Sequence, residues 1–111
     1  MARATSVNDI FEAMPRRFLP EQANSLRATL QFDLSGDGGG QWQAAIADGQ
    51  LQVTTGTAPD PNVTLQMAAI DFLALVNGEL NAMQAFMQGK VRVKGDMALV
   101  MKMQKMFAWG G

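Results

Sequence analysis

The chain has 111 residues with nine basic and ten acidic side chains, so its length favours one domain over 1–111 and its net charge of −1 gives no basic surface for nucleic acid. It contains neither cysteine nor histidine, which excludes disulfides and cysteine metal sites and removes the commonest general base and metal ligand. We therefore expect no metal and no cofactor, whereas an enzyme that uses carboxylates or lysine stays open at this point. The sequence has no signal peptide and no apolar stretch of about 18 residues, so we expect a cytoplasmic protein with at most transient membrane contact.

The first segment, residues 7–18, is predicted to form a helix with three apolar side chains on one face: Ile10, Phe11 and Met14. Asn8 or Asp9 is the expected N-cap, because short polar side chains accept hydrogen bonds from the first free backbone amides. Pro15 removes one helical hydrogen bond, so the helix is expected to kink or stop there. Residues 21–24 follow as one short turn.

The clearest pattern is the alternation of apolar and polar residues over residues 26–34, which predicts a half-buried strand. A second strand is expected around residues 42–46 and a third around residues 51–53. Asp48 and Gly49 separate these two strands and form a typical two-residue hairpin turn. The three strands together predict an antiparallel meander.

The second half of the chain mixes helices and strands. After a loop at residues 56–61, we expect a strand at 62–67, helices at 70–76 and 81–88, and a strand at 90–94. Because helices join the last two strands, we expect these strands to lie parallel. The predicted fold class is therefore α+β, with a five-stranded mixed, mostly antiparallel sheet that helices cover on one face.

The last predicted helix, residues 96–109, starts at Asp96 as N-cap and contains four of the nine methionines. Met97 and Met101 fall on the flank of its apolar arc, and Lys102 and Lys105 lie opposite. The arc itself consists of Leu99, Val100, Met103, Met106 and Phe107. Two interpretations stay open, because periodicity does not separate them. The arc either covers the sheet as ordinary core or lines a deformable pocket, for which flexible methionines are suited.

The remaining polar motifs have simple structural explanations. The glycine run at residues 38–40 lacks the Gly-Lys-Ser/Thr ending of a phosphate-binding loop, so we interpret it as a hairpin loop. Lys90, Arg92 and Lys94 form the outer face of a strand, which is either a solvated face or a contact for an anionic group. The middle helices supply further apolar side chains that are either core or pocket: Phe72, Leu75, Val76, Met83, Phe86 and Met87.

From residue 7 to residue 107 the sequence resembles the sterol carrier protein type 2 family, a sterol-binding domain found alone in many bacteria and fused to enzymes elsewhere. Residues 85–96 carry the strongest similarity, because Ala-Phe-Met-Gln-Gly-Lys-Val-Arg-Val-Lys-Gly-Asp matches the family's Ala-Phe-x-x-Gly-Lys-x-x-x-x-Gly-Asp signature. Weaker similarities lie in register at residues 30–34, 40–42, 46–49, 56–65, 71–72 and 77–78.

This resemblance implies a sheet and helices with an apolar tunnel between them. It further implies non-catalytic binding and transfer of a fatty acid, fatty acyl-CoA, sterol-like or isoprenoid lipid. The residues that match pocket-forming elements, together with inward strand residues, are Phe32, Trp42, Ile46, Phe72, Val76, Met83, Phe86, Met87, Leu99, Val100, Met103, Met106 and Phe107.

The C-terminus lacks a peroxisomal import tripeptide, so the resemblance favours a stand-alone, bacterial-type, cytoplasmic member. The alternative function is an accessory protein-interaction module, in which the last helix docks onto an enzyme of lipid or quinone synthesis or forms a homodimer. A lysine-dependent enzyme would need a buried Lys102 or Lys105, and both lie on the polar face.

Overall fold

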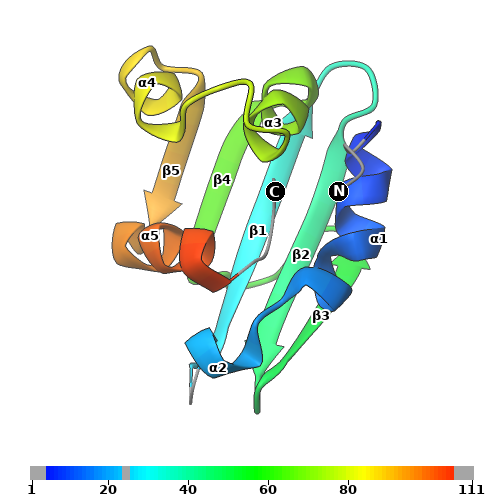
Figure 1. Ribbon diagram of the computed structural model, residues 1–111, viewed down its shortest axis with the longest axis vertical. Helices are drawn as coiled ribbons and strands as arrows, with labels where there is room; N and C mark the ends of the chain where they lie inside the picture. Colours follow the sequence, from blue (N-terminus) through cyan, green and yellow to red (C-terminus); the bar gives the residue numbers. More distant parts are fainter. Residues whose placement is uncertain (1–4, 24–25, 107–111) are drawn as a thin grey trace.

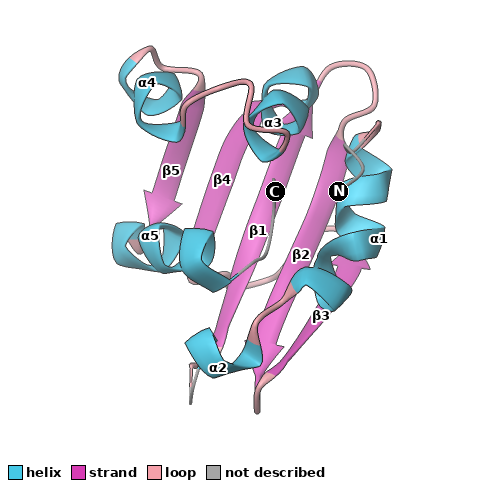
Figure 2. Cartoon of the chain, viewed as in Figure 1, coloured by secondary structure: helices cyan, strands magenta, loops and turns pink. Residues whose placement is uncertain are grey.

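The computed structural model describes residues 5–23 and 26–106. One five-stranded sheet, in the order β3-β2-β1-β4-β5, forms the back of the molecule, and the helices lie on one of its faces (Figures 1 and 2). The strands are β1 (Ala28–Ser35), β2 (Gly40–Ala47), β3 (Gln50–Thr55), β4 (Val63–Ala68) and β5 (Val91–Gly95). The helices are α1 (Val7–Arg17), α2 (Pro20–Ala23), α3 (Ala69–Val76), α4 (Ala82–Met87) and α5 (Met97–Met106). The predicted α+β class with a five-stranded mixed sheet is confirmed.

Strands β1, β2 and β3 form the predicted antiparallel meander. The turn between β2 and β3 has φ angles of 54° at Asp48 and 74° at Gly49. Positive φ at both central residues is the geometry that suits the right-handed twist of a hairpin, and it explains why Asp-Gly occupies this turn.

The predicted direction of the last two strands is wrong. β5 runs antiparallel to β4, with Met67 opposite Val91 and Val63 opposite Gly95. The parallel pair is instead β1 with β4. The reason is that α3 and α4 both lie at the end of the sheet where β4 finishes, so the chain enters β5 at that end and runs back.

Helix α1 is capped by Ser6, whose Oγ accepts a hydrogen bond from the Asp9 backbone N–H at 3.1 Å. The expectation that Asn8 or Asp9 caps this helix is therefore wrong by two or three residues. The helix also continues past Pro15 to Arg17. Its buried face packs onto the sheet and consists of Val7, Ile10, Phe11 and Met14.

Four aromatic rings form the centre of the core beneath α1. Phe11 stacks on Trp42 with ring centroids 4.6 Å apart and meets Phe32 edge-on at 5.2 Å. Phe72 of α3 stacks on Phe11 with ring centroids 5.5 Å apart and lies 5.7 Å from Phe32. The apolar side chains of Phe32 on β1 and Trp42 on β2 therefore pack against α1. Within residues 5–23 and 26–106, the structure has no helix that is long and apolar enough to cross a membrane.

Candidate functional site

An apolar cavity of about 560 Å³ lies over strands β4 and β5, between α3 and α4 at one end and α5 at the other. Eleven of its twelve lining residues are apolar, and five of these are methionines. The lining residues are Leu65, Met67, Phe72, Leu75, Asn81, Met83, Phe86, Val91, Met97, Val100, Met101 and Met103.

The floor of the cavity comes from the alternation of β4 and β5. Leu65 and Met67 are two residues apart on β4, so both side chains point to the helix-covered face. Val91 of β5 lies directly opposite Met67 in the antiparallel ladder and extends the floor toward the edge of the sheet. Because α3 begins immediately after β4, Phe72 and Leu75 lie close to this floor and form one wall.

Helix α4 forms a second wall, and Asn81 is its N-cap. The Asn81 Oδ1 accepts a hydrogen bond from the Gln84 backbone N–H at 3.1 Å. Ala85 is completely buried and holds the helix against the rest of the protein. Met83 and Phe86 are three residues apart and therefore lie on the same helical face, toward the cavity. Asn81, the one polar lining residue, thus has its side-chain oxygen engaged in capping.

Helix α5 closes the cavity, and its start is fixed by hydrogen bonds. The Asp96 backbone N–H donates to the Asn62 carbonyl at 3.0 Å, and the Asp96 Oδ1 accepts from the Ala98 and Leu99 amides at 3.0 and 3.3 Å. The expected N-cap is therefore confirmed. Gly95 has φ of +110°, and a Cβ there would overlap the Asn62 carbonyl oxygen, so only glycine allows this close approach.

Side chains on α5 divide into two groups. Leu99 is buried in the core, whereas Val100 and Met103 are half-buried and line the cavity. Met97 and Met101 also line the cavity although they are 41% and 55% exposed. Helix α5 is thus rotated so that Leu99 faces the core. Met97 and Met101, on the flank of the apolar arc, then face the cavity.

Four side chains both line the cavity and reach solvent: Met83 (61% exposed), Phe86 (46%), Met97 (41%) and Met101 (55%). We call these four residues the rim. They come from α4 and α5, so the cavity opens between these two helices. None of the lining residues that the structure describes is titratable, so these side chains offer no general acid or base. The arrangement is suited to enclose an apolar molecule.

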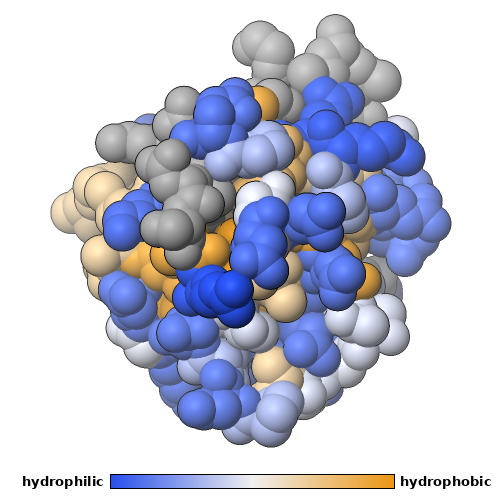
Figure 3. All heavy atoms as spheres, turned by 90° about the horizontal axis from the view of Figure 1, so that it is seen from below, coloured by the Kyte–Doolittle hydropathy of each residue, from blue (hydrophilic) through white to orange (hydrophobic). Residues whose placement is uncertain are grey.

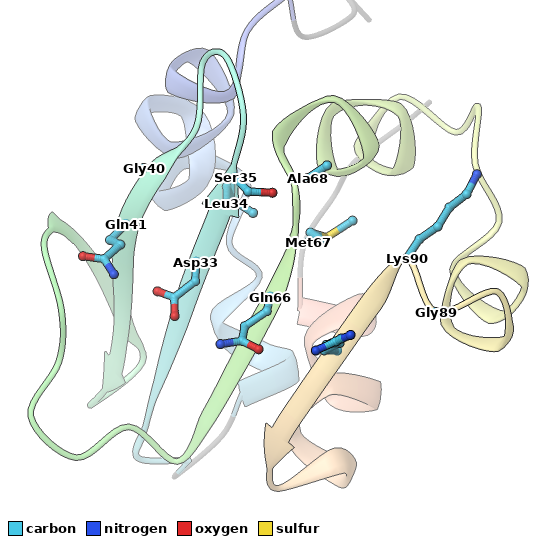
Figure 4. Close-up of a pocket in the computed structure, with 11 residues that line it drawn as sticks. Asp33, Leu34, Ser35, Gly40, Gln41, Gln66, Met67, Ala68, Gly89 and Lys90 are labelled. Atoms are coloured by element: carbon cyan, nitrogen blue, oxygen red, sulfur yellow. The ribbon is translucent and has the colours of Figure 1, made fainter.

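A second depression, of about 510 Å³, lies on the opposite, open face of the sheet (Figure 4). Gln41, Asp33 and Gln66 lie side by side across β2, β1 and β4, and Lys90 and Arg92 complete its cationic side. Asp33 accepts a hydrogen bond from the Gln31 Nε2 at 3.1 Å. This polar depression lacks the apolar enclosure of the cavity, so the cavity is the stronger candidate site.

Of the thirteen residues predicted to contact a ligand, five line the cavity: Phe72, Met83, Phe86, Val100 and Met103. Six lie elsewhere. Phe32, Trp42, Ile46 and Leu99 are buried in the core, Val76 packs against the core, and Met87 is 78% exposed on α4. The side chain of Met106 and the whole of Phe107 lie outside the described residues. Ligand contact by any of the thirteen stays a prediction, as does the expected tunnel.

Seven lining residues were absent from the predicted set: Leu65, Met67, Leu75, Asn81, Val91, Met97 and Met101. Strand alternation already placed the side chains of Leu65, Met67 and Val91 on the inward face. The methionine content of the last helix was a further signal, because it extends onto the flank where Met97 and Met101 lie.

Comparison with known proteins gives a consistent result. A model of the SCP-2 sterol transfer family matches residues 7–108. Hydroxysteroid dehydrogenase-like protein 2 from Bos taurus is 31% identical over 106 residues, which are 95% of this chain and 25% of that protein. The chain therefore spans about a quarter of the length of this curated relative.

Two solved structures share the fold. Palmitated SCP2L2 from Aedes aegypti has a TM-score of 0.75 and 28% identity, and the match covers 91% of this chain and 93% of that one. The stereoselective inverting sec-alkylsulfatase Pisa1 from Pseudomonas sp. has a TM-score of 0.82 and 20% identity, with 96% of this chain matched to 17% of that one. The latter likeness concerns the fold alone.

Proposed function

The chain belongs to the SCP-2 sterol transfer family, and from this premise we propose that it binds one elongated apolar lipid in the cavity between α4 and α5 without catalysing a reaction. Membership of this family supports lipid binding or transfer in general. The observation that carries the more specific proposal is the lining, since eleven of its twelve described residues are apolar and none of these twelve is titratable.

The size of the cavity supports a ligand of this kind. About 560 Å³ lies within the range of about 300 to 1,000 Å³ that ligand pockets usually have. Each methylene group removed from water contributes about 0.8 kcal/mol, so a 16-carbon chain gains on the order of 12 kcal/mol before the costs of association. Micromolar or tighter binding is therefore expected without an ionic contact.

Among the lipids that the sequence resemblance implies, we propose a fatty acyl chain as the principal ligand, as a fatty acid or fatty acyl-CoA. The palmitated relative, at 28% identity over nearly the whole chain, supports this choice. Five methionines in the lining are compatible with this choice, because their flexible side chains adapt to a straight chain.

We propose that the acyl chain lies along the floor formed by Leu65, Met67 and Val91 and contacts Phe72 and Met103 at its sides. The rim then covers its exposed end. In this arrangement Phe32, Trp42 and Ile46 support the cavity from the core and do not touch the ligand.

The test is a titration of the whole chain with a fluorescent fatty acid, followed by displacement with palmitate. The proposal predicts saturable binding of one probe per chain, with a dissociation constant in the micromolar range or below, and complete displacement. Absence of saturable binding would overturn the proposed function.

The second candidate is an accessory module that supports an enzyme of a lipid or quinone pathway. One observation favours it: the chain corresponds to about a quarter of a relative that is named as a dehydrogenase-like protein, so the domain occurs joined to a longer chain. Mass measured by light scattering as a function of concentration separates the two candidates. Self-association without any fatty-acid binding would favour the accessory module, as a homodimer or with an enzyme partner.

A further inference from the structure

Charge is distributed very unevenly along this nearly neutral chain. Residues 82–111 carry five of the nine basic side chains and only one acidic one, Asp96, whereas residues 1–81 carry nine of the ten acidic side chains. The Asp96 carboxylate is engaged in capping α5. The last quarter of the chain therefore has a net charge of +4 although no run of adjacent basic residues occurs there.

Three of the five basic side chains lie at one edge of the sheet, and all three are exposed: Lys90, Arg92 and Lys94. Arg92 and Lys94 are two residues apart on the edge strand β5, so their side chains lie on the same face, and Lys90 immediately precedes this strand. This is the open face of the sheet, where Lys90 and Arg92 border the polar depression (Figure 4). Helices α4 and α5 lie on the other face, at the two ends of β5 (Figure 1).

The same edge carries exposed apolar side chains. Six large hydrophobic residues of the described chain are strongly exposed, and five belong to α4 and α5: Met83, Phe86, Met87, Met97 and Met101. Seen from below, hydrophobic surface gathers toward the side of α5 and β5, and the opposite side is largely hydrophilic (Figure 3). We call these five residues, with Lys90, Arg92 and Lys94, the β5 edge surface.

We propose that the β5 edge surface docks reversibly on an anionic phospholipid bilayer, with the basic side chains at the headgroups and the apolar ones at the acyl boundary. This inference rests on the proposed function, because four of its apolar residues are also the rim of the cavity. Docking would place the cavity opening against the bilayer, so that a lipid enters or leaves with little exposure to water. The cost of exposing an acyl chain to water, about 0.8 kcal/mol per methylene, makes such contact favourable for exchange.

A bilayer fits the β5 edge surface better than a second copy of the chain or an acidic protein does. A second copy related by a two-fold axis would bring the basic side chains of both copies together without an acidic partner, since residues 82–95 contain no acidic side chain. An acidic protein would satisfy the charge, but it would cover the cavity opening and block the exchange of lipid. Flexible methionines next to basic residues suit a fluid, anionic surface.

Sedimentation of the whole chain with vesicles tests the proposal. Vesicles of phosphatidylcholine with one third phosphatidylglycerol should bind the chain, and vesicles of phosphatidylcholine alone should bind it at least tenfold more weakly. Raising the salt from about 0.05 to 0.5 M should release most of the protein, because the Debye length then falls well below 10 Å. Equal binding to both vesicles, or none to either, would overturn the proposal.

Charge variants locate the surface. The triple variant Lys90→Gln, Arg92→Gln, Lys94→Gln should bind anionic vesicles about a hundredfold more weakly, since each basic group near an anionic surface contributes several-fold. The matched control is Arg16→Gln, Arg17→Gln, Arg27→Gln, which changes the net charge equally and should stay within twofold of the original chain. Equal losses in both triple variants would show that net charge alone is responsible and would overturn the β5 edge as the docking surface.

A last variant separates docking from ligand binding. Met87 is 78% exposed and does not line the cavity, so Met87→Ser should weaken vesicle binding several-fold and leave the affinity for a fluorescent fatty acid unchanged. Unchanged vesicle binding in this variant would overturn the apolar part of the surface. If the original chain binds vesicles but no fatty acid, docking stands and the proposed function fails. If it binds fatty acid but no vesicles, the proposed function stands and docking fails.

Discussion

Phe72 stacks on Phe11 with ring centroids 5.5 Å apart and an angle of 13° between the planes, and the same Phe72 side chain lines the apolar cavity. Phe11 in turn stacks on Trp42 at 4.6 Å. A row of ring contacts therefore connects the cavity wall with the buried indole of β2. We expect a ligand that packs against Phe72 to change the surroundings of Trp42 without touching it.

Fluorescence of Trp42 should report ligand binding. In a Trp109→Phe variant, which leaves Trp42 as the single tryptophan, palmitate should change the emission intensity or wavelength with the same dissociation constant as the fluorescent fatty acid gives. Phe72→Leu keeps the wall apolar but removes the ring, so the response should fall by at least half. An undiminished response in that variant would mean that the ring row does not transmit the change.

A charge in the cavity should abolish binding more than it lowers stability. Met103 is half-buried and lines the cavity, so Met103→Asp should weaken fatty-acid binding more than a hundredfold, because an ionised carboxylate loses water there without gaining a partner. Its effect on the free energy of unfolding should be about 1 to 2 kcal/mol.

Met87→Asp is the matched control, since it adds the same charge at a site that is exposed and outside the cavity. It should leave both affinity and stability close to those of the original chain. If Met103→Asp lowers stability and binding in proportion, measured by urea unfolding and by titration, Met103 is ordinary core.

Truncating a side chain on the core face of α5 should lower stability, whereas truncating one on the cavity face should lower ligand affinity. Leu99 is 3% exposed in the core, so Leu99→Ala should cost about 3 kcal/mol of stability. Met101 is 55% exposed and lines the cavity, so Met101→Ala should cost less than about 0.5 kcal/mol but weaken palmitate binding several-fold. Unchanged palmitate affinity in Met101→Ala would remove Met101 from the binding surface.

The cap of α5 should matter through its hydrogen bonds. Asp96→Ala removes the acceptor of the Ala98 and Leu99 amides and should lower stability by about 1 kcal/mol. Palmitate affinity should fall with it, because the first turn of α5 carries Met97 of the rim. Asp96→Asn retains a capping oxygen and should behave like the original chain; a loss equal to that of the alanine variant would point to the charge instead.

Much of the fold could be predicted from the sequence because it depends on local patterns. Period-two alternation placed the Phe32 and Leu65 side chains on the covered face of the sheet, and the Asp48-Gly49 turn and the Asp96 cap followed from residue type. The direction of β5 was predicted wrongly, since a connection through two helices returns to the sheet at either end of the strands, depending on how the helices pack. How the two helices pack cannot be derived from the periodic pattern of apolar residues.

The site was harder to predict for a related reason. Alternation shows that Trp42 and Leu65 both point inward, but it does not show that α1 covers Trp42 while the cavity lies over Leu65. Likewise, the apolar arc of the last helix is visible in the sequence, whereas its rotation is set when Leu99 packs into the core. That rotation turns Met97 and Met101 toward the cavity.

Native mass spectrometry of the purified chain, followed by extraction and identification of any bound lipid, is the most direct test of whether the cavity holds a fatty acyl chain. We expect a species heavier than the apo chain by one fatty acyl lipid, or the appearance of that species at one lipid per chain when palmitate is added. The Met103→Asp chain should remain at the apo mass under the same conditions. A wild-type chain that stays at its apo mass with palmitate in excess would show that the cavity does not bind a fatty acyl chain.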